Sequence, residues 1–394
     1  MSRPFVGKLH QSDDKVLLDV TRMVWRAWRG RHPTGIDRVC LAYVDHFKDR
    51  ALALVQRRGQ FRVLSAARSR KLFDLLLKGH AVAKSDLAKV LVIAAFLDRR
   101  DPPAGGMTYL NVGHTGLNDR AIAGWIELNR VHAFYLVHDL IPITNPEFCR
   151  PQESEKHRKR MRNVLETATG VIGNSQVTLD ELSEFAAAQG MKMPPHIAAW
   201  ICGFDAGVQA RGKALDRPFF VTVGTIEARK NHIMLLQIWK RIVAAAGKEA
   251  PILVVVGQPG WEADEALDVL EDLEDLEGSV VHLQDCDDEE LAAWLAGARA
   301  LLMPSVAEGF GLPIVEALSL GTPVIASDLS VYREIVGAIP TYLQPDDQQA
   351  WEAAITSFME DGPERGRQQR QIPSYRQPTW HEHFAIVENW LSGF

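Results

Sequence analysis

Cysteine is scarce in this sequence. Among 394 residues there are four cysteines, Cys40, Cys149, Cys202 and Cys286, which lie far apart. They form no CxxC pair, which argues against a zinc ribbon or a thioredoxin-type redox site. The sequence is therefore not a disulfide-stabilised miniprotein, and we expect reduced, mostly buried thiols.

Long apolar segments are also missing. The best apolar run is Val90–Leu97, far short of the roughly 20 residues that cross a membrane. The first residues, MSRPFVGKLHQSDD, lack the apolar core of a signal peptide. We therefore expect a cytoplasmic protein without a membrane span or an obvious export signal.

The composition indicates a folded protein with an uneven charge. Hydrophobic residues make up 46% and charged residues 24%, and roughly 150 residues per domain predicts two or three domains. The net charge of −6 combines a positive and a negative half. Residues 1–212 hold 31 Lys+Arg and 21 Asp+Glu (+10), and residues 213–394 hold 13 and 29 (−16). This asymmetry indicates separate domains with different partners.

Short apolar runs alternate with longer amphipathic stretches. The expected strands are Val16–Val20, Val90–Leu97, Thr108–Val112, Ala133–Val137, Gly170–Gly173, Phe219–Val223, Ile252–Val256, Ser279–Leu283, Ala300–Met303 and Pro323–Ala326. The expected helices between the later strands are His232–Ala246, Ala263–Asp275 and Asp288–Gly297. This repetition predicts an α/β fold with two doubly wound domains, each built on a parallel sheet covered on both faces.

Two polar stretches have linker composition. Gly203–Arg217 is rich in glycine and charge and ends before a proline. Gln369–Arg376 is polar and contains Pro373, and Pro378 follows two residues after it. An apolar and aromatic helix, Trp380–Leu391, is expected after the second stretch. Domain boundaries are therefore predicted near residues 205 and 216.

The segment Pro304–Ala317, PSVAEGFGLPIVEA, lies between an expected strand and a helix. Gly309 and Gly311 allow a sharp turn and a close approach to a ligand, and Pro313 suits a first helical turn. The amide groups and dipole of the helix N-terminus would favour an anion there. The sequence thus predicts a phosphate site at this helix.

Two glutamates flank this predicted anion site. Glu308 precedes the turn, and Glu316 lies about one turn into the helix. A carboxylate beside a phosphate is repulsive unless it binds hydroxyl groups, so the pair indicates a sugar or ribose.

A second strand-to-helix loop carries basic residues. In Phe219–Ile233, FFVTVGTIEARKNHI, the strand ends in Gly224, and the loop contains Glu227, Arg229 and Lys230. Adjacent arginine and lysine can neutralise a diphosphate. The alternative is a solvated basic pair.

Together these segments resemble glycosyltransferase family 4, retaining enzymes of the GT-B fold. Glu308 and Glu316 match its E-x7-E signature, and VGTIEARKN resembles its phosphate-binding loop in the variant common among mannosyltransferases. DDEELAAWLAGARALLMPS resembles the stretch before the signature, and GTPVIASDLSVYREIVG, with Glu334, the stretch after it. The strong resemblance covers residues 216–348.

The first half resembles the family more weakly. YLVHDLIPITNPEF (135–148) contains a His-Asp pair, and VIGNSQVTLDEL (171–182) has Ser175 where a serine is usual. PTGIDRV (33–39) has the single Gly35 where the family has a glycine pair. Thr225 stands where many members have arginine, and Arg229 would supply that charge instead.

The resemblance implies transfer of a sugar from a nucleotide-sugar to an acceptor hydroxyl, with retention at the anomeric carbon. Arg229 and Lys230 would neutralise the leaving diphosphate. Glu308 would hold hydroxyls of the donor sugar, Glu316 those of the ribose, and His138 would contact the sugar. A front-face mechanism without a covalent glycosyl-enzyme is implied.

Further donor-binding residues follow from the same resemblance. The backbone at Phe310, Gly311 and Leu312 would orient sugar and phosphate, and Gly224 and Gly35 would let their loops approach the phosphates. The implied fold is two Rossmann-like domains facing a cleft. Residues 1–205 would bind the acceptor and residues 216–376 the nucleotide-sugar, while the C-terminal helix, 377–394, would cross back to the N-terminal domain.

A metal site and a cofactor are not expected. Asp285-Cys286-Asp287 spells the DxD motif of another glycosyltransferase fold. Capping of the next helix by Asp287, with Glu290 three residues on, explains it better. The histidines lack HExxH or other ligand spacing.

Basic and aromatic residues cluster at Arg22–Arg31 and Lys156–Arg162. Such helices attract anionic surfaces, so peripheral contact with the inner face of the cytoplasmic membrane is one hypothesis. A solvated basic face is the other, and no signature of a nucleic-acid-binding fold is present. Trp25 and Trp28 would share one helix face.

Several functions remain open. The favoured one is transfer from GDP-mannose or a related GDP-sugar to a saccharide or lipid-linked saccharide during synthesis of a surface polysaccharide, a lipopolysaccharide or a glycolipid. The alternatives are a UDP-sugar-dependent transferase, a nucleotide-sugar epimerase, or an inactive GT-B binding module. A phosphorylase would need a pyridoxal lysine segment, which is not recognisable.

Overall fold

The computed structural model describes residues 16–29, 35–78, 84–98, 102, 105–204, 210–261, 263–271, 276 and 278–394. By internal contacts the chain divides into two compact units, which are described separately. The first comprises Met1–Leu136, Lys159–Val171 and Met191–Pro195, and the second comprises Val137–Arg158, Ile172–Gly190 and His196–Phe394. The expected boundaries near residues 205 and 216 stay a prediction.

One sheet has seven strands in the order β3-β2-β1-β4-β5-β6-β7. The strands are β1 (Val16–Asp19), β2 (Ala51–Arg57), β3 (Gln60–Val63), β4 (Thr108–Asn111), β5 (His132–Val137), β6 (Gly170–Gly173) and β7 (His196–Ala198). β1 pairs in parallel with β2 and β4, and β4 with β5. β3 is the exception, because it pairs antiparallel to β2. The two are joined by Arg58 and Gly59, whose φ angles of 50° and 73° suit a two-residue hairpin turn.

The α-helices that lie between β1 and β7 in the sequence are α1 (Thr21–Arg29), α2 (Gly35–Phe47), α3 (Ala66–Leu77), α4 (Lys84–Leu97), α5 (Ala121–Asn129), α6 (Ile141–Thr144), α7 (Glu153–Thr167) and α8 (Gln176–Ala188). The expected strand at Val90–Leu97 is wrong, because these residues form the end of α4. A short apolar run cannot be assigned to a strand or a helix by periodicity alone. Here the helix already begins at Lys84 and carries the run with it.

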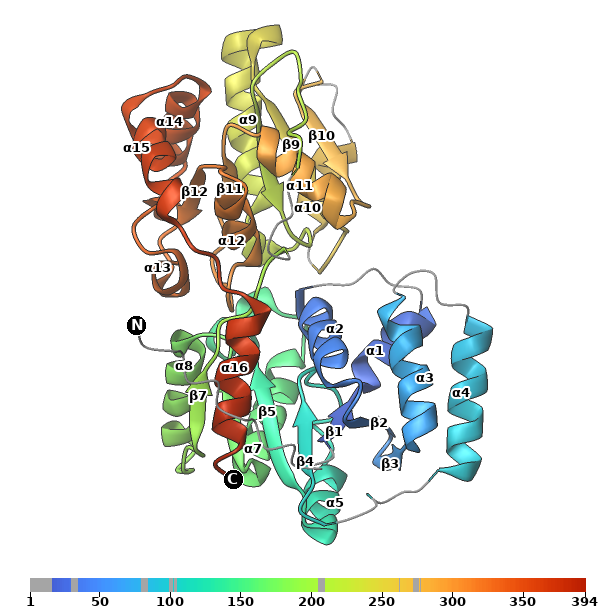
Figure 1. The fold of residues 1–394 in the computed structure, drawn as a ribbon. Helices are drawn as coiled ribbons and strands as arrows, with labels where there is room; N and C mark the ends of the chain where they lie inside the picture. The colour runs from blue at the N-terminus through green and yellow to red at the C-terminus, as the bar shows by residue number, and fades with distance from the viewer. Residues whose placement is uncertain are drawn as a thin grey trace, which may run out of the picture. The chain divides into compact units, whose positions relative to one another are not determined.

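The other sheet has six strands, and its paired strands all run parallel. Their order is β10-β9-β8-β11-β12-β13. The strands are β8 (Phe219–Val223), β9 (Ile252–Val256), β10 (Val280–Leu283), β11 (Leu301–Met303), β12 (Val324–Ser327) and β13 (Thr341–Leu343). The helices are α9 (His232–Ala246), α10 (Asp264–Glu271), α11 (Asp288–Gly297), α12 (Leu312–Ser319), α13 (Ser330–Val336), α14 (Gln348–Met359), α15 (Pro363–Gln371) and α16 (Trp380–Leu391). Figure 1 labels β9–β12 and α9–α16 of this part of the chain. The two sheets and their helices confirm the predicted pair of parallel-sheet α/β domains.

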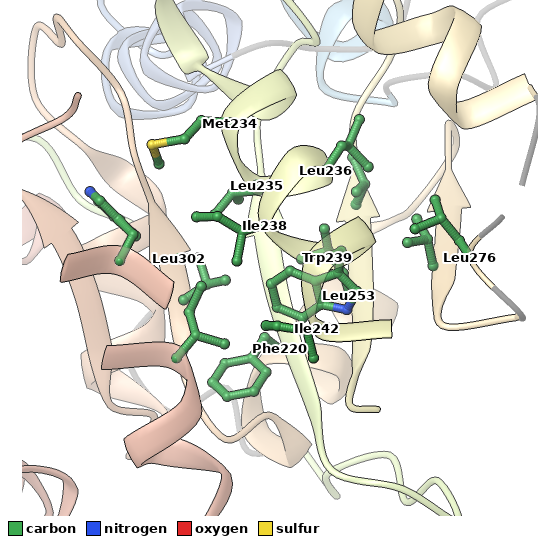
Figure 2. Packing of buried hydrophobic residues seen from close by; sticks show 14 of the residues in the cluster. Phe220, Met234, Leu235, Leu236, Ile238, Trp239, Ile242, Leu253, Leu276 and Leu302 are labelled. Carbon is green, nitrogen blue, oxygen red and sulfur yellow. The ribbon is translucent and has the colours of Figure 1, made fainter. Parts of the chain in front are cut away.

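The core of the six-stranded domain forms between α9 and the sheet. Figure 2 shows the α9 residues Leu235, Ile238 and Trp239 facing Phe220 of β8 and Leu302 of β11. All five side chains are fully buried. Their burial holds α9 against the strands, and with it the loop that leads into the helix.

The C-terminal helix α16 has the predicted bounds. Thr379 and Glu382 form a capping box at its start. The buried His383 approaches the main-chain oxygen of Trp200 at 3.1 Å through Nδ1. The helix thus contacts a residue within the range 1–205. Among the described residues, no helix has the length and apolarity needed to cross a membrane.

Candidate functional site

The centre of the site is a carboxylate held between two cations. Lys230 donates through Nζ to Oε1 of Glu308, and Arg229 donates through Nη1 to Oε2 at 3.1 Å. Ser305 donates its hydroxyl to the same Oε1 at 2.8 Å. Arg229 also pairs with Glu227 at 2.6 Å. The side chain of Glu308 is 8% exposed and that of Lys230 10%, so this is a nearly enclosed ion cluster.

The cluster fixes the charge of each member. Burial acts to raise the pKa of Glu308, but Lys230 and Arg229 outweigh it and hold the value at about 2. Burial lowers the pKa of Lys230, and the Glu308 carboxylate offsets part of that effect. Burial also opposes the charge of Arg229, yet Glu308 and Glu227 raise its pKa. Glu308 is therefore a carboxylate at neutral pH and cannot serve as a proton donor there.

The basic loop is shaped by the end of β8 and the start of α9. Ala228–Lys230 form a short 3-10 helix, and Asn231 follows with φ 56°. Asn231 donates through Nδ2 to the main-chain oxygen of Pro345 at 2.9 Å. The amide of Val306 donates to the carbonyl of Arg229 at 2.7 Å. This main-chain hydrogen bond joins the basic loop directly to the loop that carries Glu308.

Gly224 provides room for the lysine. It has φ 151°, and a Cβ atom there would lie 3.1 Å from Cε of Lys230. Lys230 thus lies close over the end of β8, at the edge where ligands bind in open parallel sheets. The prediction that Gly224 belongs to the donor site stays a prediction.

The glycines of the second loop are required by close packing. A Cβ on Gly309 would collide with the carbonyl oxygen of His138. Gly311 has φ 97° and lies against the ring of Tyr332, immediately before α12. The expected turn with Pro313 in the first helical turn is confirmed.

His138 follows β5 and is 4% exposed. Its carbonyl oxygen accepts a hydrogen bond of 2.9 Å from Nδ2 of Asn174. The structure therefore brings His138 beside the Gly309 backbone, within the second unit. Glu308, Arg229 and Lys230 belong to the same unit.

The remaining predicted donor-binding residues differ in exposure. Glu316 is 1% exposed, and a Cβ on Gly203 would lie 2.7 Å from its Cγ. Phe310 is also buried, and Leu312 begins α12. Gly35 begins α2 in the first unit, and the loop before it lies outside the described residues.

The DxD segment acts as a helix cap. Asp287 accepts a hydrogen bond of 2.8 Å from the amide of Glu290 at the start of α11, as expected. In the part of the chain that the structure describes, no group of three or more His, Cys, Asp or Glu side chains could hold a metal ion.

The basic cluster in α1 is partly neutralised inside its own unit. Arg22 and Arg26 each approach Asp37 at 2.6 Å through Nε. Arg57 lies over the Trp25 ring, whereas Trp28 is 42% exposed. The rest of the predicted cluster, residues 30 and 31, lies outside the described residues.

Sequence reasoning gave no role to several polar residues of the site. Ser305 and Tyr332 lie near Glu308, and Asn174 and Thr178 lie near His138. Ser305 lies only three residues before Glu308, so the motif could have indicated it. Tyr332 comes from α13, and nothing in the local sequence points to its contact.

Comparison with known proteins identifies sequence relatives of the part of the chain that carries Arg229, Lys230 and Glu308. The family model described as glycosyl transferases group 1 matches residues 205–375. The serotype-specific mannosyltransferase WbdA of Escherichia coli is 30% identical over 223 residues, covering 52% of this chain and 27% of WbdA. The O-antigen chain mannosyltransferase B of Escherichia coli is 37% identical over 139 residues, 35% of this chain and 36% of that protein. The chain thus spans about a quarter to a third of these two relatives.

Solved structures share the fold over nearly the whole chain. HepE of Anabaena, solved with UDP-glucose, has a TM-score of 0.69 at 17% identity and covers 96% of this chain and 100% of its own. Sucrose-phosphate synthase of Thermosynechococcus elongatus has a TM-score of 0.64 at 14% identity, covering 96% of this chain and 98% of its own. Both likenesses concern the fold. The chain therefore has the GT-B fold, and its residues 205–375 match the family of glycosyl transferases group 1.

Proposed function

We propose that this protein is a retaining glycosyltransferase that moves a mannosyl or related sugar from a GDP-sugar to a hydroxyl of a saccharide or lipid-linked saccharide. The observation that carries the proposal is the enclosed cluster of Glu308, Lys230 and Arg229 at the ends of parallel strands. A neighbouring helix, α12, begins just after Glu308. Cations, a helix N-terminus and an ionised carboxylate together suit a donor that has both phosphates and hydroxyls.

The two cations suit the leaving group. Cleavage of the glycosyl–phosphate bond leaves negative charge on the diphosphate, and fixed positive groups in a water-poor site stabilise that charge. Lys230 and Arg229 are already held in place by Glu308, so little reorganisation is needed when the donor binds. Their positions need no metal ion, and we propose metal-independent transfer.

Glu308 suits the sugar. Its pKa of about 2 keeps it ionised, so it accepts hydrogen bonds from donor hydroxyls and does not protonate a leaving group. A carboxylate also favours the positive charge that develops on the sugar ring. We propose that the leaving phosphate takes the acceptor proton on the same face, which preserves the anomeric configuration. His138 would contact the donor sugar, and Glu316 the ribose.

The relatives favour a mannosyl donor. WbdA and the O-antigen chain mannosyltransferase B are named mannosyltransferases, and the loop sequence EARKN supports the same choice. HepE was solved with UDP and with UDP-glucose, so a UDP-sugar is the second candidate. We propose a role in surface polysaccharide synthesis at the inner face of the cytoplasmic membrane. If the protein does not bind anionic liposomes at low salt, the membrane contact is contradicted.

Nucleotide binding and donor turnover test the proposal together. A bound nucleotide raises the free energy of unfolding by about 2.7 kcal/mol at a hundredfold excess over Kd, so GDP is expected to raise Tm more than UDP, ADP or dTDP. Lys230→Ala is expected to abolish the GDP shift. Turnover of GDP-mannose in EDTA, with an α-linked product seen by NMR, supports the mechanism. A GDP shift without turnover of any GDP-sugar would indicate a binding module instead.

A further inference from the structure

Two loops of the site meet backbone to backbone beside α8. Asn174 donates through Nδ2 to the carbonyl of His138 at 2.9 Å. The Thr178 hydroxyl lies 3.5 Å from the carbonyl oxygens of both His138 and Gly309. A Cβ on Gly309 would collide with the His138 oxygen. The backbones of these two loops are therefore packed too closely for a side chain to lie between them. The loop that carries His138 and the loop that carries Glu308 therefore contact each other, and Thr178 lies close to both.

The first turn of α8 holds Thr178 in this place. Ser175 caps the helix by accepting from the amide of Thr178 at 3.1 Å, and its hydroxyl donates to that of Thr178 at 3.0 Å. Glu334 of α13 accepts from the amide of Gln176 at 2.7 Å and from that of Val177 at 2.9 Å. These amides belong to the four that a helix cannot satisfy itself. A carboxylate there also interacts favourably with the helix dipole.

The orientation of Glu334 is fixed by a third donor. Trp200 donates its indole N–H to Oε1 of Glu334 at 2.9 Å. Both carboxylate oxygens are therefore engaged, and α13 and the start of α8 are held at one register. Ser175, Thr178, Trp200 and Glu334 all belong to the second unit.

We propose that Glu334 and Thr178 are positioning residues, which act through the first turn of α8 to hold the His138 backbone against Gly309. This inference rests on the proposed function, because it assigns these residues to the geometry of the transfer step. Neither side chain contacts Lys230 or Arg229 in the hydrogen bonds described above. The network should therefore affect the alignment of the donor sugar more than capture of the nucleotide.

Steady-state kinetics separate these two effects. A misplacement of about 1 Å can cost about a hundredfold in rate, so Thr178→Val and Glu334→Gln are expected to lower kcat for GDP-mannose by about tenfold to a hundredfold. The KM for the donor and the Tm shift with GDP are expected to change by less than about twofold, because charge-neutralising contacts are kept. Thr178→Ser keeps the hydroxyl and is expected to restore kcat.

Matched controls lie on α14. Thr356 donates to the carbonyl of Glu352, and Glu352 pairs with Arg241 on the surface. Thr356→Val and Glu352→Gln make the same chemical changes away from the site, and they are expected to leave kcat unchanged. Unchanged kcat in Thr178→Val and Glu334→Gln overturns the proposal, as does a loss of kcat that Thr178→Ser fails to rescue.

Hydrogen exchange gives a readout that does not depend on the proposed function. In Glu334→Gln, faster exchange is expected in peptides covering residues 174–180 and also in those covering 137–141. If the wild-type protein turns over no nucleotide-sugar, the proposed function fails. The exchange rate of residues 137–141 in Glu334→Gln still tests whether Glu334 holds the His138 backbone in place. Unchanged exchange in residues 137–141 overturns the positioning role, and faster exchange supports it.

Discussion

Gly311 lies directly against the ring of Tyr332: a Cβ added to Gly311 would fall 2.5 Å from Cε1 of that ring. Gly311 also has φ 97°, which side chains rarely adopt. The turn between Glu308 and α12 is therefore shaped by a residue of α13. Burial, and then the charge of Glu308, raise the pKa of Tyr332, which keeps its phenol neutral.

Gly311→Ala is expected to destabilise the protein by two separate effects. Backbone strain costs about 1–3 kcal/mol, and the collision with Tyr332 adds a further ~1–3 kcal/mol. Gly321→Ala is the matched control, since Gly321 has φ 86° and open space around its missing Cβ. Urea unfolding should show a clearly larger loss for Gly311→Ala. Equal losses would mean that Tyr332 does not constrain the turn.

Breaking the central ion cluster is expected to cost stability as well as activity. Glu308→Gln leaves Lys230 and Arg229 buried beside a neutral group, and removal of one partner of a buried pair typically costs about 3–5 kcal/mol. The double variant Glu308→Gln/Lys230→Met should recover part of the stability and none of the GDP-mannose turnover. A double-mutant cycle from urea unfolding measures the coupling. Additive losses would contradict the ion pair.

The depressed pKa of Glu308 predicts a pH dependence with a definite sign. Its value of about 2 lies below the ordinary 4.5, so its stabilising effect is present above about pH 4.5 and is lost as the pH falls toward 2. The stability difference between wild type and Glu308→Gln should therefore narrow as the pH falls from about 4.5 toward about 2. A constant difference across that range would show that Glu308 is not held ionised.

The buried imidazole of His232 predicts a second loss of stability at acidic pH. It lies at the start of α9, and neither ring nitrogen has a hydrogen-bond partner among the described residues. Burial, followed by the charge of Lys230, lowers its pKa from 6.5 to about 3. The unfolded chain binds the additional proton, so stability falls as the pH drops from 6.5 toward 3, by up to ~1.4 kcal/mol per pH unit.

His232→Leu is expected to remove that slope. His381→Leu on the exposed side of α16 is the control, because it removes a histidine without changing a buried site. Urea unfolding at about pH 7 and about pH 5 compares the three proteins. If the free energy of unfolding of His232→Leu depends on pH as strongly as that of wild type, His232 is not the cause of the acid sensitivity.

Asp287→Ala tests the interpretation of the DxD segment as a cap. Loss of an N-cap acceptor costs about 1 kcal/mol, whereas Asp287→Ser keeps an acceptor and should cost little. Unfolding of both variants, with and without Mn²⁺, separates capping from metal binding. A Tm increase with Mn²⁺ that Asp287→Ala abolishes would favour a metal site.

Local sequence patterns predicted most elements near the site. The bounds of β8, β9, α9, α11 and α16 agree with the predicted residues, because each has a clear apolar pattern and most have a turn or cap residue beside them. The hairpin of β2 and β3 was missed, since the turn Arg58-Gly59 resembles no strong hairpin signal. The roles of Tyr332, Thr178 and Glu334 depend on contacts between distant segments, which periodicity cannot reveal.

The His383–Trp200 contact links residues that are 183 positions apart. Synthesis at about 5–20 residues per second means that the ribosome needs many seconds to deliver α16 after Trp200 has emerged. During that interval the surface that receives α16 is uncovered in the nascent chain. α16 therefore reaches its place on Trp200 only late in synthesis, and a chain stopped before Thr379 would leave this surface exposed.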